Sequence, residues 1–325
     1  MVASTLSKSH PEPIRRLDLS KDLDAVADLI EMCFPIHRDP DGQSYVHEMR
    51  KAARDMRVLG WLNNLAEMGT QKSAGFVWDE HGAIIGNLSL IPFQYKNQRI
   101  HLIANVAVHR DHRRSGIGRA LTLHALNYLR RRGEQEAWLQ VRQDNPGAVA
   151  LYRAVGFKEQ VVRTTWRIRP LEIQERRVAL QNSVQVKRGK SADRQKHQAW
   201  LERAYPLNLR WNFGVDFNRF GLGFFQWLAN ILDGVHLKHW CVKAAGEVVG
   251  VITWQKTTTF ANSLWLAFEE EKEADYLPAA LEDVLNRLSP RHPLSIDYPQ
   301  GRSQHQFESM GFEDFRTLIW MKCRL

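Results

Sequence analysis

A basic, glycine-containing segment in the first half of the chain has the residue types of an anion-binding loop. It reads Arg113-Arg114-Ser115-Gly116-Ile117-Gly118-Arg119-Ala120. A helix that begins here would present unpaired backbone N–H groups and the positive end of its dipole, and both favour phosphate binding. Gly116 and Gly118 would let the backbone approach a diphosphate without a Cβ atom in the way. The segment therefore predicts a site for an anion with several oxygens, with added charge from the arginines.

Two common phosphate-binding motifs are excluded by the neighbouring residues. A dinucleotide-binding fingerprint requires a third glycine where Leu121 stands, and a P-loop requires a Gly-Lys-Ser/Thr sequence that is absent. A nucleic-acid-binding segment usually interleaves aromatic residues with basic ones, and this loop has no Phe, Tyr or Trp. Nucleic acid is therefore not an expected partner.

A second segment places polar groups around a short helix. It begins at Asn145-Pro146, carries Tyr152 in its middle and ends in Gly156-Phe157. Glycine at this place is typical of the C-terminal end of a helix. Asn145 alone could be a helix cap, and Tyr152 alone could be a core residue, so their meaning depends on the first segment.

Together the two segments resemble the signatures of the GNAT superfamily of N-acetyltransferases. Arg113, Gly116 and Gly118 fill the family's diphosphate motif, Arg/Gln-x-x-Gly-x-Gly/Ala, and the second segment matches its Asn-plus-helix signature. The resemblance covers residues 14–168 and implies acetyl transfer from acetyl-coenzyme A to an amine, without a metal. The residues that it implies for coenzyme A binding are Val106, Ala107, Val108, Arg113, Arg114, Ser115, Gly116, Ile117, Gly118, Arg119, Ala120 and Asn145.

The resemblance also implies a course for the reaction. Coenzyme A would lie between two strands that splay apart, 99–108 and 137–142, with its pantetheine along backbone groups near Val106 and Val108. One of these N–H groups would polarise the thioester carbonyl and hold the developing oxyanion. The amine would attack directly, and Tyr152 would protonate the leaving thiolate as a general acid.

The general base and the acceptor stay open. His101, Asn105, His109 and residues of the second half could each contact an amine directly or through water. The acceptor could be a small amine, an antibiotic, a peptide N-terminus or a protein lysine, and acetyl is the default acyl group of the family. A non-catalytic acyl-coenzyme A sensor is the alternative function, although a sensor would not need Tyr152.

Hydrophobic periodicity predicts the elements that must position these residues. The expected strands are 14–19, 76–78, 84–94, 99–108, 137–142 and 161–168, and the expected helices are 20–33, 44–65, 118–132 and 146–155. Ser20 or Asp22 is expected to cap the first helix. The result is an α/β (α+β) domain over residues 1–170, with a mixed, mostly antiparallel sheet flanked by helices.

The rest of the chain is expected to be a second, degenerate copy of this domain. A polar connector, 171–197, precedes an apolar region, 198–325. The glycine-centred pattern of residues 81–86 recurs at 245–250, and that of 151–157 recurs at 306–312, in the same order. The chain is thus predicted to hold two tandem GNAT-like domains.

The second copy lacks the groups that would bind coenzyme A. Residues 268–275, where its diphosphate loop should fall, contain no glycine and four glutamates. Such a segment would repel a diphosphate. Phe307 stands where Tyr152 stands in the first copy. The second domain is therefore expected to complete the fold and to shape the acceptor cleft.

Charge and cysteine content bound the remaining possibilities. The chain has 325 residues and a net charge of +9, which permits an anionic ligand. Cys33, Cys241 and Cys323 lack metal or redox spacing, so each is expected to be a small buried residue, and no metal site is expected. No signal peptide is visible, and the longest apolar stretch, 224–232, is too short to span a bilayer. A cytoplasmic protein without a membrane partner is expected, and its oligomeric state is not predicted.

Overall fold

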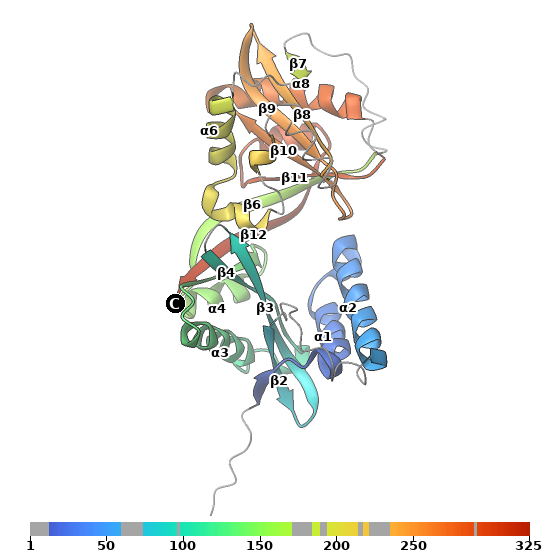
Figure 1. Cartoon of the computed structure of the whole chain (residues 1–325), viewed down its shortest axis with the longest axis vertical. Coiled ribbons are helices and arrows are strands. Elements are labelled where there is room, and N and C mark those ends of the chain that lie inside the picture. The colour runs from blue at the N-terminus through green and yellow to red at the C-terminus, as the bar shows by residue number, and fades with distance from the viewer. Residues whose placement is uncertain are drawn as a thin grey trace, which may run out of the picture. The chain divides into compact units, whose positions relative to one another are not determined.

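The computed structural model describes residues 13–59, 74–95, 98–170, 184–188, 194–213, 217–220, 235–288 and 291–325. The chain forms two compact units, each built of strands flanked by helices (Figure 1). The first contains residues Met1–Gln140, Pro146–Lys158 and Met321–Leu325, and the second contains Val141–Asn145 and Glu159–Trp320.

The first unit is a mixed sheet. Its strands stand in the order β1 (Ile14–Arg16), β2 (Ala74–Glu80), β3 (Ala83–Tyr95), β4 (Gln98–Val108) and β5 (Glu136–Arg142). Its helices are α1 (Leu19–Cys33), α2 (Pro40–Leu59), α3 (Ile117–Arg131) and α4 (Pro146–Ala154). Neighbouring strands are antiparallel except β4 and β5, which run parallel. Helix α3 supplies the crossover that a parallel pair requires.

Helix α3 is held on the sheet by one apolar stripe. Its residues at helical spacing are fully buried, and they are Leu121, Ala125, Leu126 and Leu129. A Cβ atom at Gly86 of β3 would lie 2.8 Å from Cγ2 of Ile117, so glycine there lets the first turn of α3 rest on the strand. The N-terminus of α3 is thereby positioned on this face of the sheet.

Helix α1 has a different cap from the one predicted. Asp18 is the N-cap, and its carboxylate accepts a hydrogen bond of 3.0 Å from the backbone N–H of Ser20. The Asp22 carboxylate is buried and accepts hydrogen bonds of 2.7 and 2.9 Å from Arg15. Ser20 and Asp22 lie inside the helix, so neither is its N-cap, and Asp22 also accepts a hydrogen bond of 2.8 Å from the backbone N–H of Asp18.

The last strand, β12 (Glu313–Arg324), contributes residues to both units. Its end belongs to the first unit, where the N–H of Leu325 donates to the carbonyl of Gln135 over 2.9 Å. Strand β6 (Lys158–Ile168) instead pairs with β11 (Leu294–Pro299) of the second unit. Nearly all of β6 therefore belongs to the second unit and the end of β12 to the first, so the division differs from the break expected at residue 170. Strand periodicity does not say which partner a strand pairs with.

The second unit repeats the plan of the first. Its strands stand in the order β12, β6, β11, β10 (Asn262–Phe268), β9 (Glu247–Gln255), β8 (Leu237–Ala244) and β7 (Gln185–Arg188). Its helices include α6 (Arg194–Ala204), α8 (Glu270–Leu288) and α9 (Gln304–Ser309). Strands β10 and β11 run parallel and are joined through α8, as β4 and β5 are joined through α3.

Matching turns confirm the internal repeat. The β2–β3 hairpin turns through His81 and Gly82, with φ of 55° and 90°. The β8–β9 hairpin turns through Ala245 and Gly246, with φ of 49° and 86°. Two successive positive φ angles are typical of tight hairpin turns that match the strand twist. The recurring sequence pattern is therefore a recurring structure.

Some sequence expectations fall outside the described residues. They concern residues 60–65 of the second predicted helix, much of the connector 171–197 and the apolar stretch 224–232. The described part of the connector forms β7 and the start of α6. Among the described residues, no helix is both long enough and apolar enough to cross a bilayer.

Candidate functional site

A β-bulge interrupts β4 at Asn105. In the pairing with β3, Asn87 lies opposite Ala107 and Ser89 opposite Ala104, so two residues of β4 face one residue of β3. Asn105 has a φ of 51°, a left-handed conformation that asparagine tolerates better than most residues. Its carbonyl accepts a hydrogen bond of 2.9 Å from the buried amide of Asn87. The bulge is thus held by a buried side chain.

Strands β4 and β5 part just before this bulge. Their parallel pairing runs from His101 opposite Ala137 to Ile103 opposite Leu139. Strand β4 continues to Val108 and β5 to Arg142 without further pairing between them. Backbone groups of β4 beyond Ile103 are therefore left out of the ladder with β5.

The segment between β4 and α3 is a compact basic turn. It contains a short 3-10 helix, η3 (Arg110–His112), followed by Arg114 with a φ of 67°. The hydroxyl of Ser115 donates to the carbonyl of His112. Nε of Arg113 donates to the carbonyl of Val108 over 3.2 Å, so this side chain lies back along the end of β4. The same carbonyl accepts a hydrogen bond from the thiol of Cys33.

Helix α3 begins without a side-chain cap. Its N-cap is Gly116, with a φ of 87°, and it has no side chain to accept from the first N–H groups. The N–H of Ala120 donates to the carbonyl of Gly116 over 2.9 Å and is committed to the helix. The N–H groups of Ile117, Gly118 and Arg119 precede it, at the positive end of the helix dipole, where an anion is favoured.

The two glycines of this segment have different structural roles. A Cβ atom at Gly116 would meet no atom within 4 Å, so its constraint is the left-handed backbone. A Cβ atom at Gly118 would lie 3.3 Å from Cδ1 of Leu151, and Gly118 is buried. Gly118 therefore permits close packing of α3 on α4, rather than an open approach from solvent.

Tyr152 lies in α4 with 8% of its surface exposed. Its ring packs edge-on against Phe157 at 6.0 Å, and its carbonyl accepts a hydrogen bond of 3.0 Å from the N–H of Phe157. Burial raises the pKa of the Tyr152 phenol well above its ordinary value. The phenol therefore stays protonated at neutral pH, as a proton donor must.

The three residues considered as a general base lie in different settings. His101 is buried in the paired part of β4, 3.7 Å from the carboxylate of Glu134, and burial lowers its pKa. His109 follows β4, and its Nδ1 accepts from the N–H of Asp111. Asn105 carries no basic group. None of the three is marked as a base by its geometry.

A polar cluster at the bulge includes a residue that sequence patterns did not identify. Nδ2 of Asn105 donates to the hydroxyl of Tyr45 over 2.8 Å and lies 3.4 Å from the hydroxyl of Ser89. Tyr45 belongs to α2 and is 44% exposed. Desolvation raises its pKa, and the hydrogen bond from Asn105 partly offsets this shift. No local pattern links these residues, since sixty positions separate Tyr45 from Asn105.

The second unit has no diphosphate loop at the equivalent place. Strand β10 ends at Phe268 and α8 begins at Glu270, whereas eight residues separate β4 from α3. The buried Glu273 carboxylate of α8 accepts hydrogen bonds from Arg302 and from the hydroxyl of Ser303, just before α9. An internal ion pair thus occupies the place where α3 has an open N-terminus.

The gap between β10 and β11 is also closed from within. These strands pair only through Asn262 opposite Leu294 and Ser263 opposite Ser295. Beyond this point the hydroxyl of the buried Tyr205 accepts a hydrogen bond of 3.1 Å from the N–H of Leu266. A side chain of the protein therefore takes the backbone group that corresponds to those left unpaired on β4.

Comparison with known proteins matches the first half of the chain to a protein family. Residues 23–157 match the model of the acetyltransferase (GNAT) family. The ribosomal protein bS18-alanine N-acetyltransferase of Escherichia coli (strain K12) is 44% identical over 62 residues, which are 19% of this chain and 42% of that protein. The match therefore spans less than half of the relative's length.

Two solved structures have the same architecture over nearly the whole chain. A GCN5-related N-acetyltransferase from Sphaerobacter thermophilus gives a TM-score of 0.54 at 13% identity and covers 97% of this chain and 96% of its own. A tandem GNAT protein from the clavulanic acid biosynthesis pathway gives a TM-score of 0.50 at 16% identity, with coverage of 96% and 98%. At these identities the structures show the fold alone.

Proposed function

We propose that the first unit, in which residues 23–157 match the model of the acetyltransferase (GNAT) family, transfers an acetyl group from acetyl-coenzyme A to a primary amine. The observation that carries this proposal is the uncapped N-terminus of α3, entered through Gly116 in a left-handed conformation beside the parting strands β4 and β5. In the first unit, the start of the helix and the unpaired backbone edge are both open to a ligand. In the second unit, Glu273 and Tyr205 occupy the equivalent places.

The diphosphate of coenzyme A would bind at the start of α3. The N–H groups of Ile117, Gly118 and Arg119 supply donors, and the exposed side chains of Arg113, Arg114 and Arg119 supply charge. Arg113 would exchange its hydrogen bond to the Val108 carbonyl for the phosphate. This exchange would leave that carbonyl with the thiol of Cys33 as its donor.

The pantetheine would extend along β4 after Ile103, on the edge where β5 no longer pairs with its backbone. Groups of Val106, Ala107 and Val108 would bind it as a strand would, and Asn145 would contact it from the residue before α4. An N–H of this run would hold the carbonyl oxygen of the thioester as negative charge develops on it.

The chemical step is a direct transfer. The amine nitrogen attacks the thioester carbon, the carbon–sulfur bond breaks, and the hydroxyl of Tyr152 donates its proton to the leaving thiolate. The proton lost by the amine passes to water or to a base that the geometry does not single out. The place of Tyr152 in the helix of the segment 145–157 supports this role, and burial, which raises its pKa, leaves the phenol in its acid form.

The acceptor would approach from the side of the bulge, where Tyr45, Ser89 and Asn105 gather polar groups. The Escherichia coli relative acts, by its name, on the alanine of a ribosomal protein, so a peptide amine is one candidate class beside small-molecule amines. We infer no second coenzyme A site between β10 and α8, given the internal contacts of Glu273 and Tyr205.

Turnover with a panel of amines tests the function. The full chain is mixed with acetyl-coenzyme A and with small primary amines, aminoglycosides, lysine peptides or alanine-ended peptides, and release of free coenzyme A thiol is followed. Amine-dependent release supports the enzyme. Calorimetric binding of acetyl-coenzyme A without release for any amine indicates an acyl-coenzyme A sensor. Absence of binding overturns both functions.

A further inference from the structure

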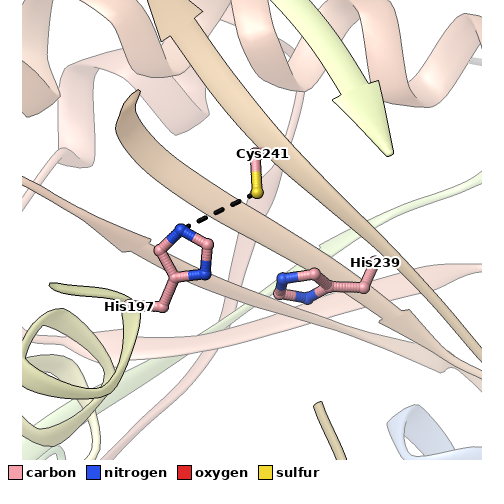
Figure 2. A group of neighbouring side chains, drawn as sticks. All are labelled: His197, His239 and Cys241. Carbon is pink, nitrogen blue, oxygen red and sulfur yellow. Dashed lines mark hydrogen bonds between the residues drawn. The ribbon is translucent and has the colours of Figure 1, made fainter. Parts of the chain in front are cut away.

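A cluster of metal-ligating side chains lies in the second unit, away from the proposed transfer site. One ring nitrogen of His197, one ring nitrogen of His239 and Sγ of Cys241 all lie within 4.8 Å of one another. Sγ of Cys241 is 3.7 Å from Nε2 of His197. Figure 2 shows the thiol and the two rings gathered around a common space.

Two packed elements bring these residues together. His239 and Cys241 are two positions apart on β8, so strand alternation places both on the same face of the sheet. Helix α6 packs on this sheet through contacts with β9 and β10, and it presents His197 to the pair on β8. The fold thus brings together three potential ligands from one strand and one helix.

We propose that His197, His239 and Cys241 bind a divalent metal ion of the zinc class. Imidazole nitrogen and thiolate sulfur are the ligands that zinc prefers. Two such ligands on tetrahedral zinc lie about 3.3–3.8 Å apart, given bond lengths of about 2.0–2.3 Å. The 3.7 Å between Cys241 and His197 fits this range, and the other pairs, at most 4.8 Å apart, would have to close on metal binding. The fourth ligand would come from outside these three residues, for example from water.

The partners of His239 favour this role. Its Nδ1 lies 2.6 Å from the hydroxyl of Thr253, its direct neighbour on β9, which is fully buried. With Nδ1 as the donor, Nε2 keeps a lone pair, and this second-shell contact orients the ring as in many metal sites. Nε2 is buried and accepts no hydrogen bond from any described residue.

The surroundings would strengthen binding. His197 stacks on Trp200 at 6.0 Å, and His239 faces Phe220 at 6.4 Å. His197 and Cys241 are 6% and 2% exposed. An apolar shell limits competition from water. Metal binding would release the thiol proton of Cys241, since the thiolate is the ligand, and would tie α6 to β8.

The alternative is a buried thiol that hydrogen-bonds to His197 without a metal. The full chain, freed of any histidine tag and treated with a chelator, is titrated with Zn²⁺ against a chromophoric competitor and separately with Co²⁺. We expect one ion per chain, a rise in Tm with Zn²⁺, and a thiolate-to-cobalt charge-transfer band. If the wild-type protein binds no stoichiometric ion and shows no such band, the proposed site is overturned, and no variant is needed for this test.

Variants then locate the ligands. Cys241→Ala and His239→Gln should abolish stoichiometric binding and the cobalt band. Cys323→Ala and His101→Gln, which change buried residues of the same types in the first unit, should keep both. Thr253→Val should weaken zinc binding by about 10–100-fold. A cobalt band that survives Cys241→Ala, or that Cys323→Ala removes, overturns the assignment.

Discussion

Nδ2 of Asn105, in the bulge of β4, donates a hydrogen bond of 2.8 Å to the hydroxyl of Tyr45 in α2. This contact ties a helix of the first unit to the point where β4 and β5 separate. It also sets a polar group of α2 beside the backbone that would carry the thioester. The contact therefore connects the element packing of the first unit with the proposed acceptor site.

Tyr45→Phe should raise the KM for the acceptor amine by about 2–10-fold, since a net hydrogen bond contributes about 0.5–1.5 kcal/mol. The affinity for acetyl-coenzyme A should not change, because the cofactor loop lies elsewhere on the unit. Steady-state kinetics with both substrates varied would measure this. Tyr128→Phe, on α3 beside Phe76, is the matched control. A changed affinity for acetyl-coenzyme A in Tyr45→Phe would contradict the assignment of Tyr45 to the acceptor site.

Tyr152→Phe should lower kcat by about 10²–10⁴-fold if proton transfer limits the rate, because only the acid is lost. Affinity for acetyl-coenzyme A should stay nearly constant. The pKa of Tyr152 is raised by burial, so its ionisation should cause no fall in kcat between neutral pH and about pH 10. If kcat of the wild type fell with rising pH below about pH 10, and this fall were absent in Tyr152→Phe, the raised pKa would be contradicted.

Gly116→Ala should cost about 1–2 kcal/mol of folding free energy, because alanine disfavours the left-handed backbone found there. Gly133→Ala is a matched control, since Gly133 also has a positive φ, of 74°, and open space around its Cβ position. Both variants should lose similar stability in urea unfolding, and only Gly116→Ala should weaken acetyl-coenzyme A binding in calorimetry. Equal affinity for both would show that the start of α3 does not bind the diphosphate.

Arg113→Ala and Arg114→Ala should each weaken acetyl-coenzyme A binding by about 1–3 kcal/mol, as expected for charged hydrogen bonds. Calorimetry at two salt concentrations would show a reduced salt dependence in each variant. Arg131→Ala, an exposed arginine at the opposite end of α3, should leave the affinity unchanged. An Arg131→Ala effect equal to the other two would indicate a general charge effect.

Glu273→Gln should destabilise the chain by about 3–5 kcal/mol, because it leaves the Arg302 guanidinium without its buried partner. The exposed Glu308→Gln, in α9, should change stability little.

Calorimetry of the wild-type chain should give one acetyl-coenzyme A per chain. Two equivalent sites per chain would refute the proposal that the second unit binds none.

The sequence alone was sufficient to predict the resemblance of the first half to the GNAT family, which the match of residues 23–157 supports, and to predict most of the elements. The spacing of Arg113, Gly116 and Gly118 before an amphipathic helix is a local property, and the helix begins at Ile117, one residue before the predicted start at Gly118. The paired glycines Gly82 and Gly246 likewise predicted equivalent hairpins, because a turn with successive positive φ angles restricts the residues that can form it.

The cap of α1 shows the limit of local patterns. Asp18, Ser20 and Asp22 are all plausible capping residues. The structure makes Asp18 the N-cap, whereas the buried Asp22 carboxylate bonds both Arg15 on β1 and the backbone N–H of Asp18. The different roles of Gly116 and Gly118 were likewise set by contacts with other elements. Only the position of Leu151 on α4 showed that Gly118 serves helix packing.

Tertiary structure alone decided which distant segments meet. It paired β6 with β11 and carried the end of β12 into the first unit. It also brought His197 to Cys241, although the separation of 44 residues has no recognisable metal spacing. Periodicity reports which face of an element is buried, because that depends on neighbours one or two turns away. Which elements share that buried face depends on packing across the whole unit, and no local pattern contains it.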